Sequence, residues 1–275
     1  MKISLSTAAI LGILCVTVLV GCTKNNSTPP AIIVKQWTVM LSAKNENPAP
    51  LGRSETGTAS FMLMSDNSLK YTININNLAS GDIIAAAHLH AGDAITTGPE
   101  ILDIDAVFNG GIGVGTTTNL RQTLVDSLKD DTNEIYFHAH SIQVPSGLFR
   151  GQLNTNIEMA ADVALSGANE STPVTTSAIG LATFRLTTSQ KLYTKYVITN
   201  LEAGDTLVAA HIHKGAVGVS GPVIVPVYGS NAEFGTVKII PITDPALFTS
   251  LKADAIYANA HSKMHPGGIV RGQIR

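Results

Sequence analysis

The chain has 275 residues, a formal net charge of −2 and charged residues at only 14% of its positions. It has no basic run, which argues against nucleic acid as a partner, and no glycine-rich phosphate loop or Gly-x-Ser-x-Gly motif. A low aromatic content of 5%, with many Thr, Val, Ile and Ala residues, favours an all-β protein outside the cytoplasm.

The first residues read as an export signal. Lys2 is followed by an apolar stretch from Leu5 to Val20, the pattern of a cleaved signal peptide. The stretch ends Leu19-Val20-Gly21-Cys22, which resembles the lipobox of bacterial lipoproteins. The resemblance implies a signal peptide over 1–21, lipidation of Cys22 and attachment to a membrane. A transmembrane anchor is the alternative, because the stretch is nearly long enough to span a bilayer.

A lipoprotein of this kind would lie in the bacterial cell envelope, with the outer membrane as the expected location. Residues 22–33, mostly Asn, Ser, Thr and Pro around Thr23–Pro30, are predicted to be a flexible tether. Cleavage would remove Cys15 and lipidation would consume Cys22, so no disulfide is expected and stability must come from burial.

The region after the tether predicts short strands with one short helix. Leu69, Tyr71, Ile73 and Ile75 alternate with polar residues in the clearest strand pattern. Strands are predicted near Val34–Leu41 and over Thr58–Leu63, Leu69–Asn76, Ile83–His90, Ile135–His140 and Leu148–Leu153. Leucines spaced by four predict a helix over Leu120–Leu128.

The same order returns 123 residues later. Ala87-His88-Leu89-His90 with Gly98-Pro99 recurs as Ala210-His211-Ile212-His213 with Gly221-Pro222. A second phrase also recurs, from His140 to Arg150-Gly151-Gln152 and from His261 to Arg271-Gly272-Gln273. Such self-similarity indicates a tandem duplication, with a first repeat over 34–154 and a second over 159–275. Each repeat is predicted to be an antiparallel β-sandwich with one short helix.

The repeated words place polar side chains on shared strand faces. Residues two apart on a strand point to the same side, so three neighbouring strands in each repeat would bring their polar faces together. In the first repeat these faces carry His88, His90, Tyr136, His138, His140, Arg150 and Gln152; in the second they carry His211, His213, Tyr257, Asn259, His261, Arg271 and Gln273.

Two interpretations of this cluster are open. Neutral imidazoles are good ligands for copper and zinc, and all eight histidines of the chain fall in or beside the repeated words. On this hypothesis the ligands are His88, His90, His140, His211, His213 and His261. Alternatively, the histidines join Tyr, Gln and Arg in a hydrogen-bond network that fixes loop ends against the sheet. The nearby arginines would suit an anion, and the recurrent Glu46 and Glu170 are interpreted as structural acceptors.

The words His-x-His, Gly-Pro, Tyr-x-x-x-His and Pro-Gly-Gly-x-x-Arg-Gly-Gln, the last as Pro266 to Gln273, resemble the CHRD domain. The second repeat matches the pattern better, since the first has His138 where the family usually has Asn, and Ser146 in its loop. The resemblance implies an immunoglobulin-like sandwich or barrel and supplies no activity. A looser likeness is to the Greek-key sandwich of Cu/Zn superoxide dismutase, through the His-x-His strand, a later His and an Arg ten residues on.

Together these patterns favour a non-enzymatic, lipid-anchored binding or structural module, in which the clustered histidines could also hold a metal. The competing hypothesis is a copper carrier or a copper enzyme of dismutase-like geometry. The two differ in whether bound copper turns over a substrate.

Overall fold

The computed structural model describes residues 29–275. The predicted signal peptide, Cys22 and most of the predicted tether therefore lie outside the described residues. Between residues 29 and 275, no helix is long and apolar enough to cross a membrane.

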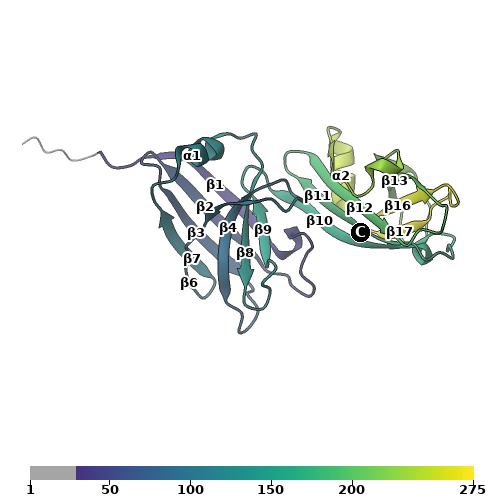
Figure 1. The fold of residues 1–275 in the computed structure, drawn as a ribbon, viewed down its shortest axis with the longest axis horizontal. Coiled ribbons are helices and arrows are strands. Elements are labelled where there is room, and N and C mark those ends of the chain that lie inside the picture. Colours follow the sequence, from purple (N-terminus) through teal and green to yellow (C-terminus); the bar gives the residue numbers. More distant parts are fainter. Residues whose placement is uncertain (1–28) are drawn as a thin grey trace, which may run out of the picture. The chain divides into compact units, whose positions relative to one another are not determined.

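The first repeat is an antiparallel sheet with one α-helix (Figure 1). Within the described residues its elements are β1 (Ile33–Ser42), the 3-10 turn η1 (Ala43–Asn45), β2 (Thr56–Met64), β3 (Leu69–Asn76), β4 (Ile84–Ala91), β5 (Glu100–Asp103), β6 (Val107–Asn109), β7 (Ile112–Thr117), α1 (Gln122–Lys129), β8 (Ile135–Ser141) and β9 (Phe149–Gln152). The strand order is β5-β4-β8-β9-β1-β2-β3-β7-β6.

One seam divides this sheet. β1 and β9 share a single residue pair, Ser42 with Arg150, whereas every other pair of neighbours shares at least three. Val39 on one side of the seam and Leu89 and Phe137 on the other are fully buried in the same core. The sheet must therefore curve around that core, because its two parts present their apolar faces to each other.

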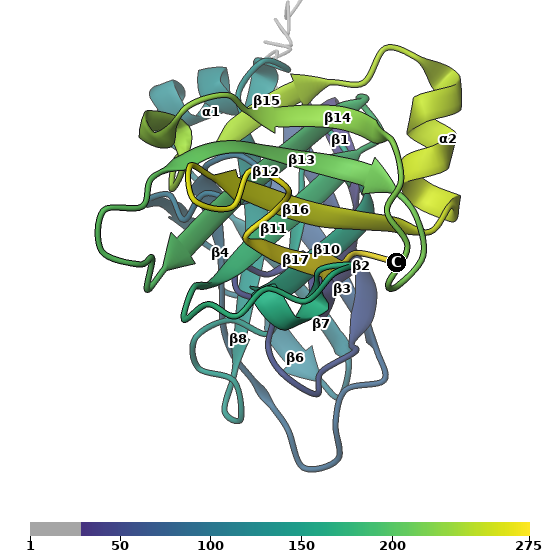
Figure 2. The same cartoon turned by 90° about the vertical axis from the view of Figure 1, so that its right-hand side faces the viewer.

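The second repeat has the same architecture (Figure 2). Its described elements are β10 (Ile157–Ser166), η2 (Gly167–Asn169), β11 (Ile179–Thr187), β12 (Lys191–Thr199), β13 (Leu207–Lys214), β14 (Val223–Tyr228), η3 (Asn231–Glu233), β15 (Lys238–Pro241), α2 (Pro245–Ala253), β16 (Ile256–Ser262) and β17 (Val270–Gln273). The order β14-β13-β16-β17-β10-β11-β12-β15 again has one single-pair seam, Ser166 with Arg271.

The helices follow local sequence rules. Pro245 opens α2, and the Asp244 side chain accepts a hydrogen bond from the Ala246 amide at 2.8 Å, which satisfies one of the free donors of the first turn. In α1, Leu124, Val125 and Leu128 form the buried face. Each repeat thus buries one side of a short helix against the end of its sheet.

The all-β class and the single α-helix in each repeat are confirmed for the described residues. Alternation in β3 is confirmed too, since Leu69, Tyr71 and Ile73 are buried while Lys70 and Asn74 are exposed. The sequence did not predict β5, β6 and β7. These strands are short or glycine-containing, with Gly113 and Gly115 in β7, so they lack a clear period of two.

A fully buried arginine joins the two repeats. Arg185 in β11 pairs with Asp162 at 2.7 Å, and its Nε donates to the Asn45 carbonyl at 3.3 Å. Its Nη2 donates to the carbonyl of Glu46. The charge is therefore paired once. Two of its hydrogen bonds hold the segment after β1, and two more go to the carbonyls of Ala161 and Phe184, so Arg185 links the first repeat to β10 and β11.

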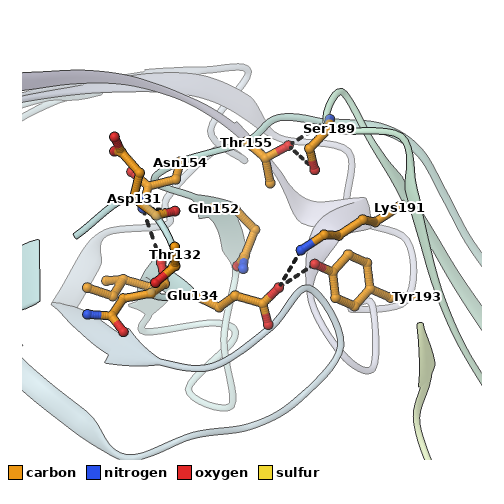
Figure 3. Close-up of a pocket in the computed structure, with 11 residues that line it drawn as sticks. Asp131, Thr132, Glu134, Gln152, Asn154, Thr155, Ser189, Lys191 and Tyr193 are labelled. Atoms are coloured by element: carbon orange, nitrogen blue, oxygen red, sulfur yellow. Dashed lines mark hydrogen bonds and ion pairs between the residues drawn. The ribbon is translucent and has the colours of Figure 1, made fainter. Parts of the chain in front are cut away.

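A polar pocket of about 280 Å³ lies beside this link (Figure 3). The carboxylate of Glu134 accepts a hydrogen bond from Tyr193 and lies 3.9 Å from the Lys191 Nζ. Burial raises the pKa of Tyr193 far above its usual value, so its hydroxyl stays a donor. Glu134 therefore holds β12 to the segment before β8, whereas the other carboxylate of the pocket, Asp131, pairs with Lys35 at 2.6 Å.

Removing the Arg185 side chain tests its role. We expect Arg185→Ala to lower the free energy of unfolding by about 3 kcal/mol, because it leaves the Asp162 carboxylate and two carbonyls without their partner. Urea unfolding followed by circular dichroism measures this. Lys195→Ala on the neighbouring strand should change stability by no more than about 0.5 kcal/mol, and a similar small loss for Arg185→Ala would contradict the assignment.

Candidate metal centre

In the first repeat, three adjacent strands carry the polar residues on one face. His88 pairs in register with His138, and His138 pairs with Arg150, so the three side chains stand side by side on β4, β8 and β9. The ring centroids of His138 and His140 are 4.3 Å apart, and those of His88 and His140 are 5.4 Å apart. The opposite face of β4 holds the buried Ala87 and Leu89. Alternation along the strands therefore separates the imidazoles from the core.

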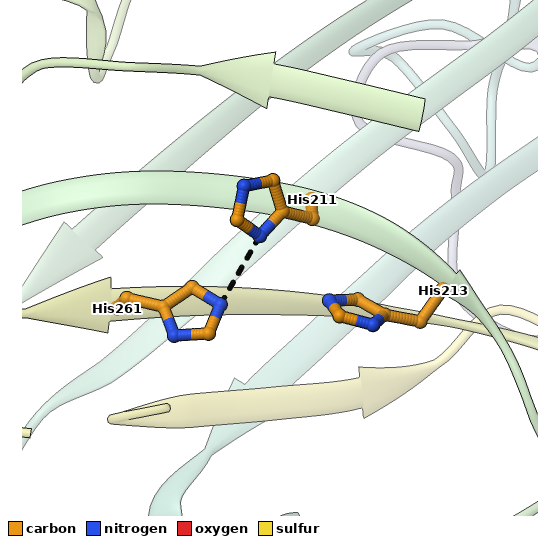
Figure 4. Close-up of side chains that lie close together, drawn as sticks. All are labelled: His211, His213 and His261. Atoms are coloured by element: carbon orange, nitrogen blue, oxygen red, sulfur yellow. Dashed lines mark hydrogen bonds between the residues drawn. The ribbon is translucent and has the colours of Figure 1, made fainter. Parts of the chain in front are cut away.

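The second repeat builds the corresponding triad. His211 and His213 lie on β13 and His261 on β16, and Figure 4 shows the three rings close together between these strands. One potential ligand atom from each of the three lies within 4.8 Å of the other two. The Nδ1 of His211 is 3.2 Å from the Nε2 of His261. Small inward movements of these side chains could bring three nitrogens around one ion.

Backbone carbonyls fix the tautomers of two histidines in each repeat. The Nδ1 of His213 is 2.9 Å from the Gly221 oxygen, and the Nδ1 of His261 is 3.0 Å from the Pro266 oxygen. A carbonyl oxygen only accepts, so Nδ1 carries the proton and Nε2 keeps its lone pair. The first repeat repeats these contacts, from His90 to Gly98 at 3.0 Å and from His140 to Pro145 at 2.8 Å.

The fixed rings have free acceptor atoms. Among the described residues, Nε2 of His213 and Nε2 of His90 are buried without a hydrogen-bond partner. A buried polar atom without a partner is costly unless something else binds it. Metal-ligating histidines commonly donate their second nitrogen to a carbonyl, which is the pattern found here.

Partial burial keeps the rings neutral. It lowers the pKa of His211 to about 4, with His261 and His213 adding to the effect, and it also lowers the pKa of His213 and His261. The pKa values of His90 and His140 are lowered for the same reason. Neutral imidazole is the form that binds a metal, so these groups need not lose a proton to solvent at pH 7.

A stack of three side chains supports the cluster. The Arg150 guanidinium lies 3.3 Å from the centroid of the Tyr136 ring, and that ring stacks on His90 with centroids 5.0 Å apart. Arg150 is only 2% exposed and donates to the carbonyls of Asp93 and Thr96. Its two Nη atoms thus donate to the loop between β4 and β5, while its Nε is buried without a hydrogen-bond partner among the described residues. The arginine therefore supports this loop, and its position over Tyr136 adds a cation–π contact.

The second repeat keeps this stack and the loop contacts. Arg271 lies 3.4 Å from the Tyr257 centroid, Tyr257 stacks on His213 at 4.8 Å, and Arg271 Nη2 donates to the Ala216 and Val219 carbonyls. Gln152 and Gln273 each donate to the glycine carbonyl that begins the loop. The predicted hydrogen-bond network therefore exists, and it holds the loops that carry the tautomer-fixing carbonyls.

The repeated Gly-Pro word has a steric reason. A Cβ on Gly98 would stand 1.5 Å from the Ala91 oxygen, and one on Gly221 would stand 1.6 Å from the Lys214 oxygen. Any side chain here would push the loop away from the strand. The glycine therefore lets its own carbonyl reach the histidine.

Glu46 and Glu170 occupy equivalent places but meet different partners. Glu46 Oε1 is 3.0 Å from His138 Nδ1, whereas Glu170 Oε1 accepts from Asn259 Nδ2 at 2.7 Å. Burial raises the pKa of Glu170 to about 7 despite the opposing effects of Arg271 and Asn259. The two sites therefore differ in the partner of this glutamate and in the number of imidazoles.

The CHRD domain model matches residues 37–153 and 161–274, and so covers most of the chain. The chain belongs to the CHRD family. No curated protein and no solved structure matches it. Both CHRD domains carry the histidine, tyrosine and arginine words on one sheet face.

Sequence reasoning grouped side chains that lie near one another in the structure, but it did not predict several of their contacts. The ring of His138, placed among the supporting residues, packs against His90 and His140. The carboxylates of Glu100 and Asp103 lie 3.7 and 3.8 Å from His88 Nε2, a contact that was not predicted. The pairing of β5 with β4 brings them there, and no clear sequence pattern predicts β5.

The raised pKa of Glu170 predicts a pH dependence of stability. Between its usual pKa of 4.5 and its folded value of about 7, the folded state keeps a proton that the unfolded state has released. This contribution to stability is full below pH 4.5 and is lost as the pH rises through 7. Glu170→Gln should therefore match wild type at pH 4 and melt at least about 2–4 °C higher at pH 8.

Thermal unfolding at the two pH values measures the difference. Glu158→Gln, at an exposed carboxylate, serves as the matched control and should show no such gain at pH 8. Equal melting temperatures of wild type and Glu170→Gln at pH 8 would show that the buried carboxyl carries no penalty.

Proposed function

We propose that this CHRD protein is a lipid-anchored, extracytoplasmic metal-binding module that holds copper or zinc through His211, His213 and His261. The duplication extends the proposal to His88, His90 and His140 in the first domain. The module is non-enzymatic: it binds and presents the ion, and the membrane attachment through Cys22 keeps it in the cell envelope.

The fixed tautomers are the single observation that supports metal binding best. Two of the three histidines in each domain donate Nδ1–H to a loop carbonyl and keep Nε2 as an acceptor. A network built only for stability would use both nitrogens of a buried ring, yet Nε2 of His213 is buried without a partner in residues 29–275. A metal ion would satisfy it.

The chemistry of the donors fits copper or zinc. Three imidazole nitrogens at roughly 2 Å suit both ions and leave a position for water or another ligand. Binding requires the proton on His211 Nδ1, which now points to His261, to move to the far nitrogen of the ring. The three ligands of the second domain would all be neutral imidazoles, so the complex would keep the positive charge of the ion.

The single-pair seam supports the finer fold assignment. We infer a sandwich in each domain, related to the immunoglobulin-like and dismutase-like Greek keys, because each sheet is joined across its core by one residue pair. In such a sandwich the histidine face lies on the outside of one layer, under the loops that precede β5 and β14.

Removing one nitrogen ligand tests the metal site. We expect wild type, loaded with Cu²⁺ and desalted, to retain about one equivalent in each domain. His213→Phe keeps the ring that stacks on Tyr257 but lacks the nitrogen, so it should lose the second-domain equivalent with at least a roughly 100-fold weaker affinity. Elemental analysis and competition with a chelator measure both quantities.

Tyr257→Phe is the matched control, because it keeps both stacking contacts and removes only the hydroxyl that accepts from the Gly221 amide. It should retain copper. Wild type that keeps no metal at micromolar affinity would contradict the proposal. Copper-loaded protein should consume superoxide no faster than copper in buffer, and a faster rate would instead favour the dismutase-like enzyme.

The anchor has its own test. Cys22→Ser should abolish incorporation of labelled palmitate and move the protein from the membrane fraction to the soluble fraction of a bacterial host, because acylation needs the thiol. Unchanged fractionation of Cys22→Ser would favour a transmembrane anchor.

A further inference from the structure

A second group of metal-ligand side chains lies apart from the histidine triad. Glu202 and Asp205 precede β13, and His265 lies between β16 and β17. One oxygen or nitrogen of each lies within 4.8 Å of the other two, and Glu202 Oε2 is 3.1 Å from His265 Nε2. Two carboxylates and one imidazole form a set of donors that divalent transition metals accept.

Two backbone amides fix the carboxylate of Asp205 through one of its two oxygens. Its Oδ1 accepts from the amides of Thr206 at 2.8 Å and Met264 at 3.0 Å. In the described residues its Oδ2 is buried with no charged group or backbone donor bonded to it, and the Ser262 side chain, the counterpart of Ser141, lies close enough to help lower the pKa of Asp205. A buried carboxylate oxygen with at most one hydroxyl beside it is stabilised further by a cation, which offsets its lost hydration.

The first domain supplies that cation. Asp82, the counterpart of Asp205, has the same Oδ1 contacts, with the amides of Ile83 and Gln143. Its Oδ2 binds the Arg53 guanidinium at 2.5 Å and the Ser141 hydroxyl at 2.7 Å. Arg53 also pairs with Glu55 at 2.6 Å. In the first domain a guanidinium therefore offsets the charge of this carboxylate.

The second domain has lost the guanidinium and gained ligands. Thr176 stands three residues before β11, as Arg53 stands three residues before β2. By the repeat offsets, Glu202 replaces Ala79 and His265 replaces Val144. The Thr176 hydroxyl lies beside Glu202. The substitutions thus exchange one cation for a carboxylate and an imidazole at the same place.

We propose that Glu202, Asp205 and His265 bind a divalent cation of the Zn²⁺ class, which takes the place of the Arg53 guanidinium. The ion ties the loop before β13 to the loop between β16 and β17, as Arg53 ties the equivalent loop of the first domain through Asp82. Its role is structural, and it does not depend on metal binding by the histidine triad.

The test uses Zn²⁺ alone, on the full chain. Wild type, Glu202→Gln/His265→Gln and Thr176→Arg are loaded with Zn²⁺, desalted and analysed for zinc. We expect both variants to retain one equivalent fewer than wild type, because one lacks ligands and the other supplies the competing guanidinium. In EDTA, Thr176→Arg should melt higher than wild type, and zinc should raise its melting temperature less.

A second readout locates the ion. Mn²⁺ should broaden the backbone amide resonances of Thr206 and Met264 in wild type and leave them sharp in both variants. The variant His213→Phe should keep this broadening, which separates the site from the triad. Equal zinc content in all proteins, or a melting temperature that follows the protonation of His265 and ignores zinc, would overturn the proposal.

Discussion

The hydrogen bond from a histidine Nδ1 to a loop carbonyl is the contact on which the site depends. It occurs twice in each domain, and its acceptors are the carbonyls of Gly98 and Pro145 in the first domain and of Gly221 and Pro266 in the second. Each bond fixes a ring orientation and a tautomer together, because the carbonyl can only accept. The strands bring the imidazoles to one face, but they do not decide which nitrogen is free. The loops decide that, so the geometry of the loops sets the chemistry of the sheet.

The arginine and tyrosine of the repeated words serve this same end. Arg150 and Arg271 are almost fully buried, and each spans from a tyrosine ring to carbonyls of the loop above it. Burying a guanidinium is costly unless its donors are used, and the loop carbonyls accept from the Nη atoms, while the Nε of Arg150 has no partner within the described residues. The arginine thereby holds the loop against the polar face of the sheet, and the tyrosine ring is stacked between the arginine and the histidine. From the sequence, an arginine near a histidine cluster was interpreted as suited to an anion. In the structure this arginine donates to loop carbonyls and holds the loop.

The face of each strand could be predicted from the sequence, because a period of two needs no knowledge of neighbours. For this reason His88, His90, Tyr136 and His140 could be grouped before the structure was known. The helix α1 could be located from its leucines, because their spacing of four also depends on the local sequence alone. The carbonyl acceptors could not be predicted, because a backbone carbonyl is present at every residue and no residue type marks it. The strands β5 and β7 are short or rich in glycine, so they were not predicted. The contact between His88 and the carboxylates of β5 could therefore not be predicted either. The Glu46–His138 contact joins residues 92 positions apart and depends on the position of η1, which contacts β9, the neighbour of β8.

The duplication allows the two domains to be read against each other. Where the scaffold is indispensable the domains agree: the tautomer-fixing bonds, the stack and the loop glycines are the same in both. Where they differ, charge is exchanged in matched sets. The pair His138 and Glu46 of the first domain corresponds to Asn259 and Glu170 of the second. Next to the aspartate that both domains share, the first domain has Arg53 and Glu55, and the second has Glu202 and His265. A lone substitution at any of these positions would leave a charged group without its partner. The paired differences between the domains therefore keep each charged group next to a partner: Arg53 lies beside Asp82 in the first domain, and His265 lies beside Glu202 in the second.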